Sequence, residues 1–267
     1  MSFPFVFFLG LVLGMTGAVP APRHLSSTSV TTVRGTGHPL LGTDEAGIVT
    51  HGSRATPRVA LTFDADMTPG MQRALQSGRV KSYDNVMVRQ ILRATKTPAT
   101  FFFTGMWAET YPAVARSIAA DPLFEVEDHS YDHPGFEQPC YGLSAIATAD
   151  KALNIRRAQA TIQSVTGRMP RYFRFPGGCA NASDVRVVQK LGLTAVDWDV
   201  ISGDAGQPDA GVIVRTVLKA TRNGSIIVMH SHGGKAPATA LALPAIISGL
   251  KARGFVFVTV QDLLGAK

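Results

Sequence analysis

The sequence predicts an α/β fold in which parallel strands alternate with helices and close into a barrel. Seven short apolar stretches of strand length are separated by longer stretches with helical periodicity, which is the pattern of a parallel sheet. Polar side chains directly follow several of these strands, and barrels of this class carry their active sites at the carboxyl ends of the strands. A chain of 267 residues with 45% hydrophobic content is long enough for one such domain.

The expected strands differ in character along the chain. The first is an apolar run, the third alternates apolar and acidic residues, and the sixth is almost wholly apolar, as expected of a strand buried on both faces. In order, the expected strands are Arg58–Phe63, Ala99–Phe103, Phe124–Glu127, Tyr172–Phe175, Thr194–Asp197, Ser225–Met229 and Phe255–Val260. The expected helices are Asp84–Ala94, Tyr111–Ala120, Leu143–Val165, Asp184–Leu191, Gly211–Thr221 and Ala238–Ala252.

Two carboxylates, Asp64 and Asp66, follow the first strand. Side chains of a strand alternate between its faces, so these two acids share a side if the chain stays extended past Phe63, while Ala65 points away. Turns also favour aspartate, so this feature alone does not establish a site.

Two histidines, His129 and His133, follow the third strand with a spacing of four. This spacing fits one helical turn or a tight loop around a metal ion, and histidine is the commonest nitrogen ligand of zinc-like ions. A carboxylate from the first strand would complete a set of two histidines and one aspartate with an open position, which is typical of a catalytic metal site.

Three later strands also end in groups that can do chemistry. Arg174 precedes the glycine turn Gly177–Gly178, Asp204 follows the strand at 194–197, and His230 ends the strand at 225–229. Glycines let backbone amides approach a ligand closely. Because these groups occupy the same place relative to their strands, we expect them to meet at one end of the barrel.

In order and chemistry, these motifs resemble the polysaccharide deacetylases of carbohydrate esterase family 4. The resemblance covers the chain from about Arg58 to its C-terminus and implies a distorted barrel of about seven β/α units. The motifs that carry it are Thr62-Phe63-Asp64 with Asp66, His129-Ser130 with His133, Arg174-Phe175-Pro176-Gly177-Gly178, Asp204 with Pro208, and Val228-Met229-His230.

The resemblance also implies a role for each motif residue. His129, His133 and an aspartate hold one divalent ion, for which we expect zinc, with cobalt or manganese as alternatives. Asp64 acts as general base and Arg174 orients it. The backbone N–H of Gly177 stabilises the oxyanion, and His230 acts as general acid with Asp204 bonded to it.

The sequence departs from the family pattern in three places. Ala65 stands where the second of two adjacent aspartates is usual, so Asp66 is the expected third ligand, with Asp128 or water as rivals. Ala205 replaces a tryptophan that walls the acetyl pocket, a role that Trp198 could fill unless it belongs to the core. Val228 replaces a leucine beside the acetyl methyl. His232 has no counterpart in the motif, and we expect it to be a loop residue rather than a metal ligand.

The N-terminal part of the sequence differs in composition from the rest. Residues 1–21 are expected to be a cleaved signal peptide, because Phe3–Val19 is apolar and small residues follow it; an uncleaved anchor is the alternative. Residues 22–57 are rich in Ser, Thr, Gly and Pro and are expected to be a linker or N-terminal wrap, leaving 58–267 as the catalytic domain.

The two cysteines, Cys140 and Cys179, follow the histidine loop and the Arg174 turn respectively. If both loops surround one site in an exported chain, a disulfide between them is expected; a nucleophilic thiol is the alternative. In the chain-entropy model, closing a loop of about forty residues contributes roughly 4 kcal/mol.

The net charge of +7 favours anionic surfaces such as wall polymers, and the sequence lacks the basic runs of a nucleic-acid binder. We therefore expect a secreted or cell-envelope monomer, without stable membrane insertion after signal cleavage. Its expected activity is metal-dependent removal of acetyl groups from a polymer of N-acetylglucosamine, either peptidoglycan or chitin. An O-acetyl esterase on xylan and a glycan-binding pseudoenzyme remain as alternatives.

Overall fold

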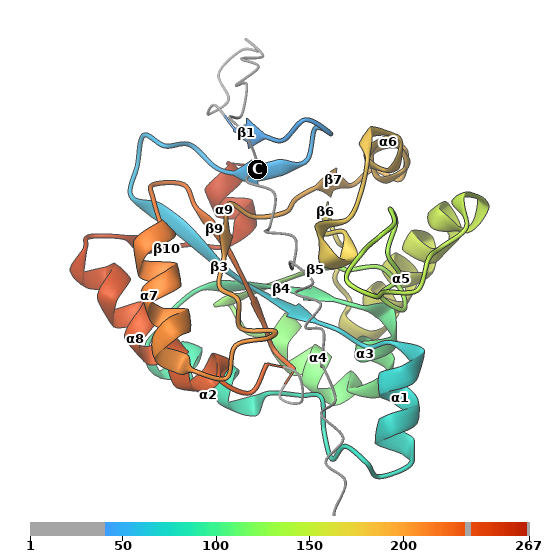
Figure 1. Ribbon diagram of the computed structural model, residues 1–267, viewed down its shortest axis with the longest axis horizontal. Helices are drawn as coiled ribbons and strands as arrows, with labels where there is room; N and C mark the ends of the chain where they lie inside the picture. Colours follow the sequence, from blue (N-terminus) through green and yellow to red (C-terminus); the bar gives the residue numbers. More distant parts are fainter. Residues whose placement is uncertain (1–40, 233–235, 266–267) are drawn as a thin grey trace, which may run out of the picture.

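The computed structural model describes residues 41–232 and 236–265, so the expected signal peptide at 1–21 lies outside the described residues. The core is a curled sheet of parallel strands, surrounded by helices (Figure 1). Its strands are β3 (Arg58–Ala65), β4 (Ala99–Phe103), β5 (Phe124–Asp128), β6 (Tyr172–Phe173), β7 (Thr194–Ala195), β8 (Val200–Ile201), β9 (Ile226–His230) and β10 (Val256–Phe257). They run in the order β7-β6-β5-β4-β3-β9-β8, and β10 also pairs with β3. The predicted α/β class and distorted parallel barrel are confirmed.

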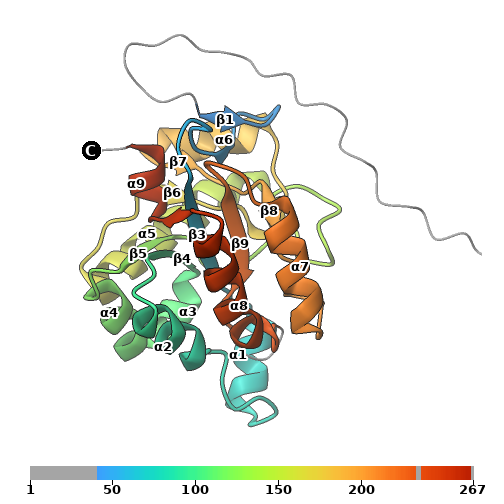
Figure 2. The ribbon, with the colours of Figure 1, turned by 90° about the vertical axis from the view of Figure 1, so that its left-hand side faces the viewer.

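The helices follow the strands along the chain and cover the outside of the sheet. Helices α7 and α8 pack side by side near β9 (Figure 2). The helices are α1 (Pro69–Gln76), α2 (Val86–Ala94), α3 (Gly105–Thr110), α4 (Pro112–Ala119), α5 (Lys151–Thr166), α6 (Ala182–Lys190), α7 (Ala210–Ala220), α8 (Thr239–Ala252) and α9 (Val260–Leu264). Among these described helices, none has both the length and the apolar character needed to cross a membrane.

Strand β3 shows how the sheet separates two apolar layers. Val59, Leu61 and Phe63 belong to the large cluster between the sheet and the helices, whereas Ala60 belongs to a smaller cluster inside the barrel. The side chains at 62 and 64 share the face of Ala60 because strand side chains alternate. The inner face of β3 therefore changes from apolar to polar toward its carboxyl end.

The N-terminal segment helps to close the curled sheet by bridging β7 and β9. Its strands β1 (Gly42–Thr43) and β2 (Val49–His51) form an antiparallel pair. Val49 forms a bridge to Val196 after β7, and His51 forms one to Ser225 before β9. The described part of the predicted linker or wrap thus packs against the barrel, while the boundary at residue 58 stays a prediction.

The helix predicted over Leu143–Val165 begins later, at Lys151. The amide of Gly135 donates to the carbonyl of Ser144, and the amide of Ile146 donates to the carbonyl of Gly135. These backbone groups are bonded to the preceding loop and are therefore unavailable to a helix. The start of this predicted helix was wrong for that reason.

Sequence periodicity missed three short helices, α1, α3 and α9, and the two-residue strand β8. Helices of five to eight residues are too short to show a periodic pattern. Their threonine caps were the available signal, because Thr68, Thr104 and Thr259 each accept a hydrogen bond from an amide of the first turn.

Candidate active site

The polar residues predicted from the strand ends meet at the carboxyl end of the sheet. Asp64 lies in β3 and is paired in register with His230 of β9. His129 and Arg174 directly follow β5 and β6, whose ends are joined by a hydrogen bond from the Arg174 amide to the Asp128 carbonyl at 2.9 Å. The parallel arrangement thus brings together side chains that are more than one hundred residues apart.

Arg174 and Asp64 form a buried ion pair. The Arg174 Nη1 atom lies 2.7 Å from Asp64 Oδ1 and 2.8 Å from the hydroxyl of Thr62. Its side chain is fully buried, and the guanidinium lies 3.9 Å from the centre of the Phe102 ring. The carbonyls of residues 196 and 197 accept its remaining hydrogen bonds. Arg174 is therefore held rigidly, and its charge neutralises a carboxylate in a dry environment.

Asp66, His129 and His133 form a set of three converging ligand atoms. The Asp66 Oδ1 atom lies 3.5 Å from His129 Nε2 and 3.5 Å from His133 Nε2. These distances are too long for hydrogen bonds, and Oδ1 is buried with no partner in the part of the chain that the structure describes. Two ligands about 2.1 Å from a tetrahedral zinc ion stand about 3.4 Å apart, so the set fits such an ion.

The two histidines are oriented by the backbone around them. His129 Nδ1 lies 2.9 Å from the carbonyl of Arg174; because a carbonyl only accepts, Nδ1 carries the proton and Nε2 presents its lone pair. The segment from Ser130 to His133 is a tight loop rather than a helical turn, with left-handed φ values of 68° and 63° at its two ends. This loop turns the second imidazole back toward the first.

Burial and neighbouring charges set the protonation states of this ligand set. Burial lowers the pKa of His133 to about 4, which keeps its imidazole neutral and able to bind a cation. Burial by itself would raise the pKa of Asp66, but electrostatic interactions with the surrounding histidines, first His133, and a hydrogen bond from His232 outweigh it and hold that pKa well below its usual value. Asp66 is therefore ionised.

Asp128, the rival acid, points away from this set. Phe124 and Val126 of β5 belong to the outer cluster, and alternation places Asp128 on their face and His129 on the opposite one. One Asp128 oxygen accepts from the amide of Ser130 at 2.8 Å, and burial raises its pKa well above the usual value. Neither ligand group among the described residues includes it.

His230 and Asp204 form a second pair, next to the pair of Arg174 and Asp64, because His230 is the register partner of Asp64. His230 Nδ1 lies 2.7 Å from Asp204 Oδ1, and the His230 amide donates to the other oxygen at 2.8 Å. The hydroxyls of Ser202 and Thr239 also donate to this carboxylate, at 3.0 and 2.6 Å. Burial alone would lower the pKa of His230, but the charge of Asp204 and its hydrogen bond raise it to about 9. His230 is thus protonated near neutral pH.

His232 lies in the loop after β9, but it is more than an ordinary loop residue. It is 2% exposed, and its Nε2 donates to Asp66 Oδ2 at 3.0 Å. The signal that could have found it is the spacing His230-x-His232, since residues two apart on an extended chain share a face. Thr62, which bonds to Arg174, and Ser202 and Thr239, which bond to Asp204, carried no comparable signal.

The glycine turn after β6 lies between the disulfide and Trp198. Gly177 has a φ of 64°, and a Cβ atom there would lie 2.9 Å from Cys140 Sγ, so only glycine fits. A Cβ atom at Gly178 would lie 3.1 Å from the Trp198 ring. Val228 is buried in β9, two residues before His230 and on the same face. Their roles in the oxyanion and acetyl sites stay predictions.

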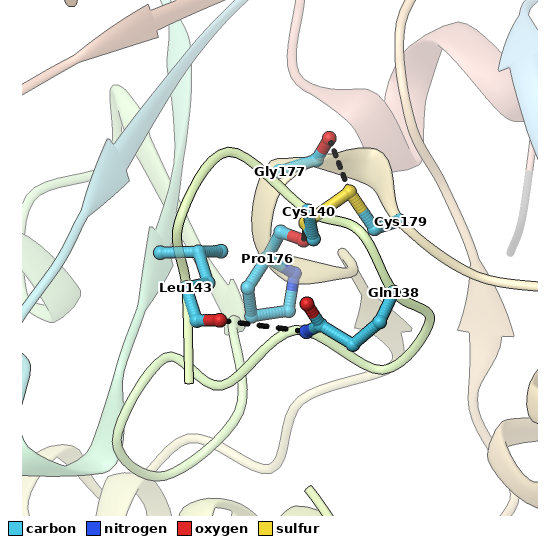
Figure 3. Close-up of a disulfide and its surroundings, with 6 residues drawn as sticks. All are labelled: Gln138, Cys140, Leu143, Pro176, Gly177 and Cys179. Carbon is cyan, nitrogen blue, oxygen red and sulfur yellow. Dashed lines mark hydrogen bonds between the residues drawn. A yellow bond between two sulfur atoms is a disulfide. The ribbon is translucent and has the colours of Figure 1, made fainter. Parts of the chain in front are cut away.

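Cys140 and Cys179 form the predicted disulfide, which joins the histidine loop to the glycine turn (Figure 3). Their Cα atoms are 5.9 Å apart, and 39 positions separate them in the sequence. No free cysteine occurs among the described residues, which excludes a thiol nucleophile there. The bridge fixes two loops that border the site.

Comparisons with known proteins agree with this geometry. The chain is 28% identical over 219 residues to a peptidoglycan-N-acetylglucosamine deacetylase of Listeria monocytogenes, covering 80% of this chain but only 40% of that relative. It is 32% identical over 181 residues to a chitooligosaccharide deacetylase of Azorhizobium caulinodans, covering 63% of this chain and 82% of the relative.

A solved structure shares the fold. A pseudoenzyme of carbohydrate esterase family 4 from Bacillus anthracis superposes with a TM-score of 0.67 at 22% identity, over 82% of this chain and 69% of its own. A family model described as polysaccharide deacetylase matches residues 51–196, more than half of the chain, and spans Asp64, Asp66, both loop histidines and Arg174. With its signature residues assembled at one end of the barrel, the chain belongs to the polysaccharide deacetylase family.

Proposed function

We propose that this protein is a metal-dependent hydrolase that removes N-acetyl groups from a polymer containing N-acetylglucosamine. The observation that carries the proposal is the convergence of Asp66, His129 and His133 beside the Asp64–Arg174 pair. Zinc is the favoured ion because the ligands are imidazoles and one carboxylate at tetrahedral spacing, with cobalt and manganese as alternatives.

Amide hydrolysis needs a nucleophile near neutral pH and a proton for the departing amine. A divalent ion held by the three ligands would supply the first need by acidifying water and polarising the acetyl carbonyl. Asp64 Oδ2 lies 3.7 Å from His129 Nε2 and is therefore next to the ion's position, while Arg174 binds the other oxygen. Asp64 is the proposed general base that accepts the proton of the attacking water.

His230 is the proposed general acid. Its Nδ1 is occupied by Asp204, so Nε2 is the nitrogen that faces the substrate, and the raised pKa of about 9 keeps a proton there. Asp204 fixes the ring orientation and stabilises the charged imidazole. The general base and the general acid therefore stand on adjacent paired strands, β3 and β9.

The glycine turn and two apolar side chains complete the proposed site. The N–H of Gly177 is the proposed donor to the oxyanion, in a turn clamped by the disulfide. Trp198, which packs against Gly178, and Val228 are proposed to border the acetyl group. Ala205 leaves the acetyl pocket without the tryptophan that is usual in the family at that position.

The relatives support an acetylated glycan as the substrate. Their names specify peptidoglycan N-acetylglucosamine and chitooligosaccharides, and the net charge of +7 favours an anionic wall. Together with the apolar N-terminus, this supports a secreted or envelope-associated protein, which we propose to be a monomer. An O-acetyl esterase would use the same groups but depend less on His230, because an alcohol leaves more easily than an amine.

The test compares two isosteric variants with the parent protein, after metal removal and resupply with zinc, cobalt or manganese. We expect metal-restored acetate release from N-acetylglucosamine oligomers. Asp66→Asn should lose both bound metal and activity, whereas Asp64→Asn should keep the metal and lose activity by at least about 10²-fold. Metal content is measured by elemental analysis of the dialysed protein.

The same experiment separates the alternatives. Release of acetate from acetylated xylan but not from N-acetylglucosamine oligomers or peptidoglycan would identify an O-acetyl esterase. Retained binding to wall polymers, with no acetate release from any substrate or metal, would identify a pseudoenzyme.

A further inference from the structure

A second group of potential metal ligands adjoins the one already described. Asp66, His230 and His232 also offer three ligand atoms within 4.8 Å of one another. Asp66 belongs to both groups, and its two oxygens are divided between them. Oδ1 faces the two loop histidines at 3.5 Å, and Oδ2 faces His232 at 3.0 Å. This is the arrangement of a carboxylate that can bridge two cations.

One ring nitrogen of His232 makes no hydrogen bond to the described residues. It is 2% exposed, and its Nδ1 has no hydrogen-bond partner within the described ranges 41–232 and 236–265. A buried polar atom without a partner costs about 1–3 kcal/mol, which binding of an ion can offset. A cation could replace the proton shared between Nε2 and Asp66, and this single proton would then move to Nδ1.

His230 is already oriented as a metal ligand. Asp204 accepts a hydrogen bond from its Nδ1 at 2.7 Å, the carboxylate–histidine arrangement that fixes a ligating imidazole with Nε2 outward. The side chain is 21% exposed, so solvent and ions can reach it. The rings of His230 and His232 lie 5.2 Å apart, on the same side of an extended segment.

We propose that Asp66, His230 and His232 form a second, weaker site for a divalent cation, and that its occupation inhibits the enzyme. This inference rests on the proposed function, in which His230 supplies a proton from Nε2. A cation bound to that nitrogen displaces the proton, so the amine can no longer be protonated. Affinity is lower than at the first site because the two cations share Asp66 and, at the roughly 4 Å spacing of paired metal sites, repel each other.

The test titrates the metal-free full chain with zinc by equilibrium dialysis and follows acetate release in parallel. The parent protein should bind two equivalents, with activity rising up to the first and falling at least about tenfold as the second binds. In His232→Gln the amide can still donate to Asp66, but it is a poor zinc ligand. This variant should bind one equivalent, and its activity should not fall at excess zinc.

His51→Ala is the control, because His51 lies in β2 and outside both ligand groups. It should bind two equivalents like the parent. The proposal is overturned if the parent saturates at one equivalent, or if His232→Gln still binds two. A third result would assign His232 a different role. If the parent binds only one equivalent, His232→Ala loses it and His232→Gln keeps it, then His232 merely orients Asp66. An inactive parent would refute the proposed function. The second site would still be decided, because dialysis measures the number of bound equivalents directly.

Discussion

Two buried aspartates at the same end of the barrel are held by partners of different kinds. Asp64 is bonded to Arg174, a guanidinium that is fully buried. Asp204 is bonded to His230, which is 21% exposed and can lose its proton. The first pair is suited to holding a fixed charge beside the proposed metal ligands, and the second to the proposed delivery of a proton to a leaving group.

The environments of the two pairs follow from this difference. Arg174 donates to a carboxylate, a hydroxyl and two carbonyls, so its guanidinium is fixed in place. Asp204 instead accepts hydrogen bonds from Ser202, Thr239 and His230, which stabilise its negative charge. A fixed cation beside Asp64 and several hydrogen-bond donors around Asp204 are two ways to stabilise a buried carboxylate.

The largest expected effect comes from removing the fixed charge. Arg174→Ala would leave Asp64 buried without its partner and should lower the free energy of unfolding by about 3–5 kcal/mol. The matched control is Arg93→Ala. The Arg93 side chain is 40% exposed, so its ion pair with Asp121 should contribute at most about 1 kcal/mol to the free energy of unfolding. Urea denaturation of both variants measures the difference, and equal losses would contradict it.

Removing the proton donor should affect catalysis rather than folding. We expect His230→Ala to lower kcat/KM on an N-acetyl substrate by about 10²–10⁴-fold, because the amine then leaves unprotonated. The loss on an acetate ester should be much smaller. His51→Ala serves as the control for changing a histidine. Comparable losses on amide and ester would argue against a general-acid role.

The pH dependence separates the two pairs in the unchanged protein. With a pKa of about 9, His230 should lose its proton above that pH, so activity should fall about tenfold per pH unit there. The contribution of this pair to stability is fully present below pH 6.5, the ordinary histidine value, and is lost as pH rises through about 9. Rate profiles and unfolding midpoints from pH 6 to 11 test both, and a flat profile through pH 10 is the opposing result.

The smallest expected effect concerns one donor to Asp204. Thr239→Val keeps the shape of a buried side chain but removes the hydroxyl that donates at 2.6 Å. The free energy of unfolding should fall by about 1–2 kcal/mol. Thr239→Ser retains the hydroxyl and should recover most of the loss, as judged by denaturant midpoints. A serine variant as unstable as the valine variant would assign the effect to packing.

The sequence predicted the three central strands closely, and it predicted helices α2, α4, α6, α7 and α8 to within two residues at each end. Strand β4 has the predicted bounds, and β3 and β5 extend one or two residues beyond theirs. Strands β3 and β4 are long apolar runs, as expected of strands buried on both faces, whereas β5 alternates apolar and acidic residues. Strands β6 and β7 are only two residues long, shorter than the four residues expected of each.

Alternation along a strand could also be read from the sequence, and it placed Asp64 and Asp66 on one side. The same rule, applied to β5, puts Asp128 opposite His129, which the sequence reading left open. What it could not supply is the partner across the barrel: His232 lies 166 positions from Asp66, and no local pattern links them. Contacts between distant segments depend on sheet order, which local periodicity does not encode.

By itself, the sequence determined the order of strands and helices, the motif residues at the strand ends and the pairing of the two cysteines, because these follow from hydrophobic period, motif spacing and number. Only the tertiary structure decided that the segment before residue 58 helps to close the sheet, that Asp66 rather than Asp128 faces the histidines, and that His232 binds Asp66. Those outcomes depend on which strands become neighbours and on the direction in which each side chain leaves its strand.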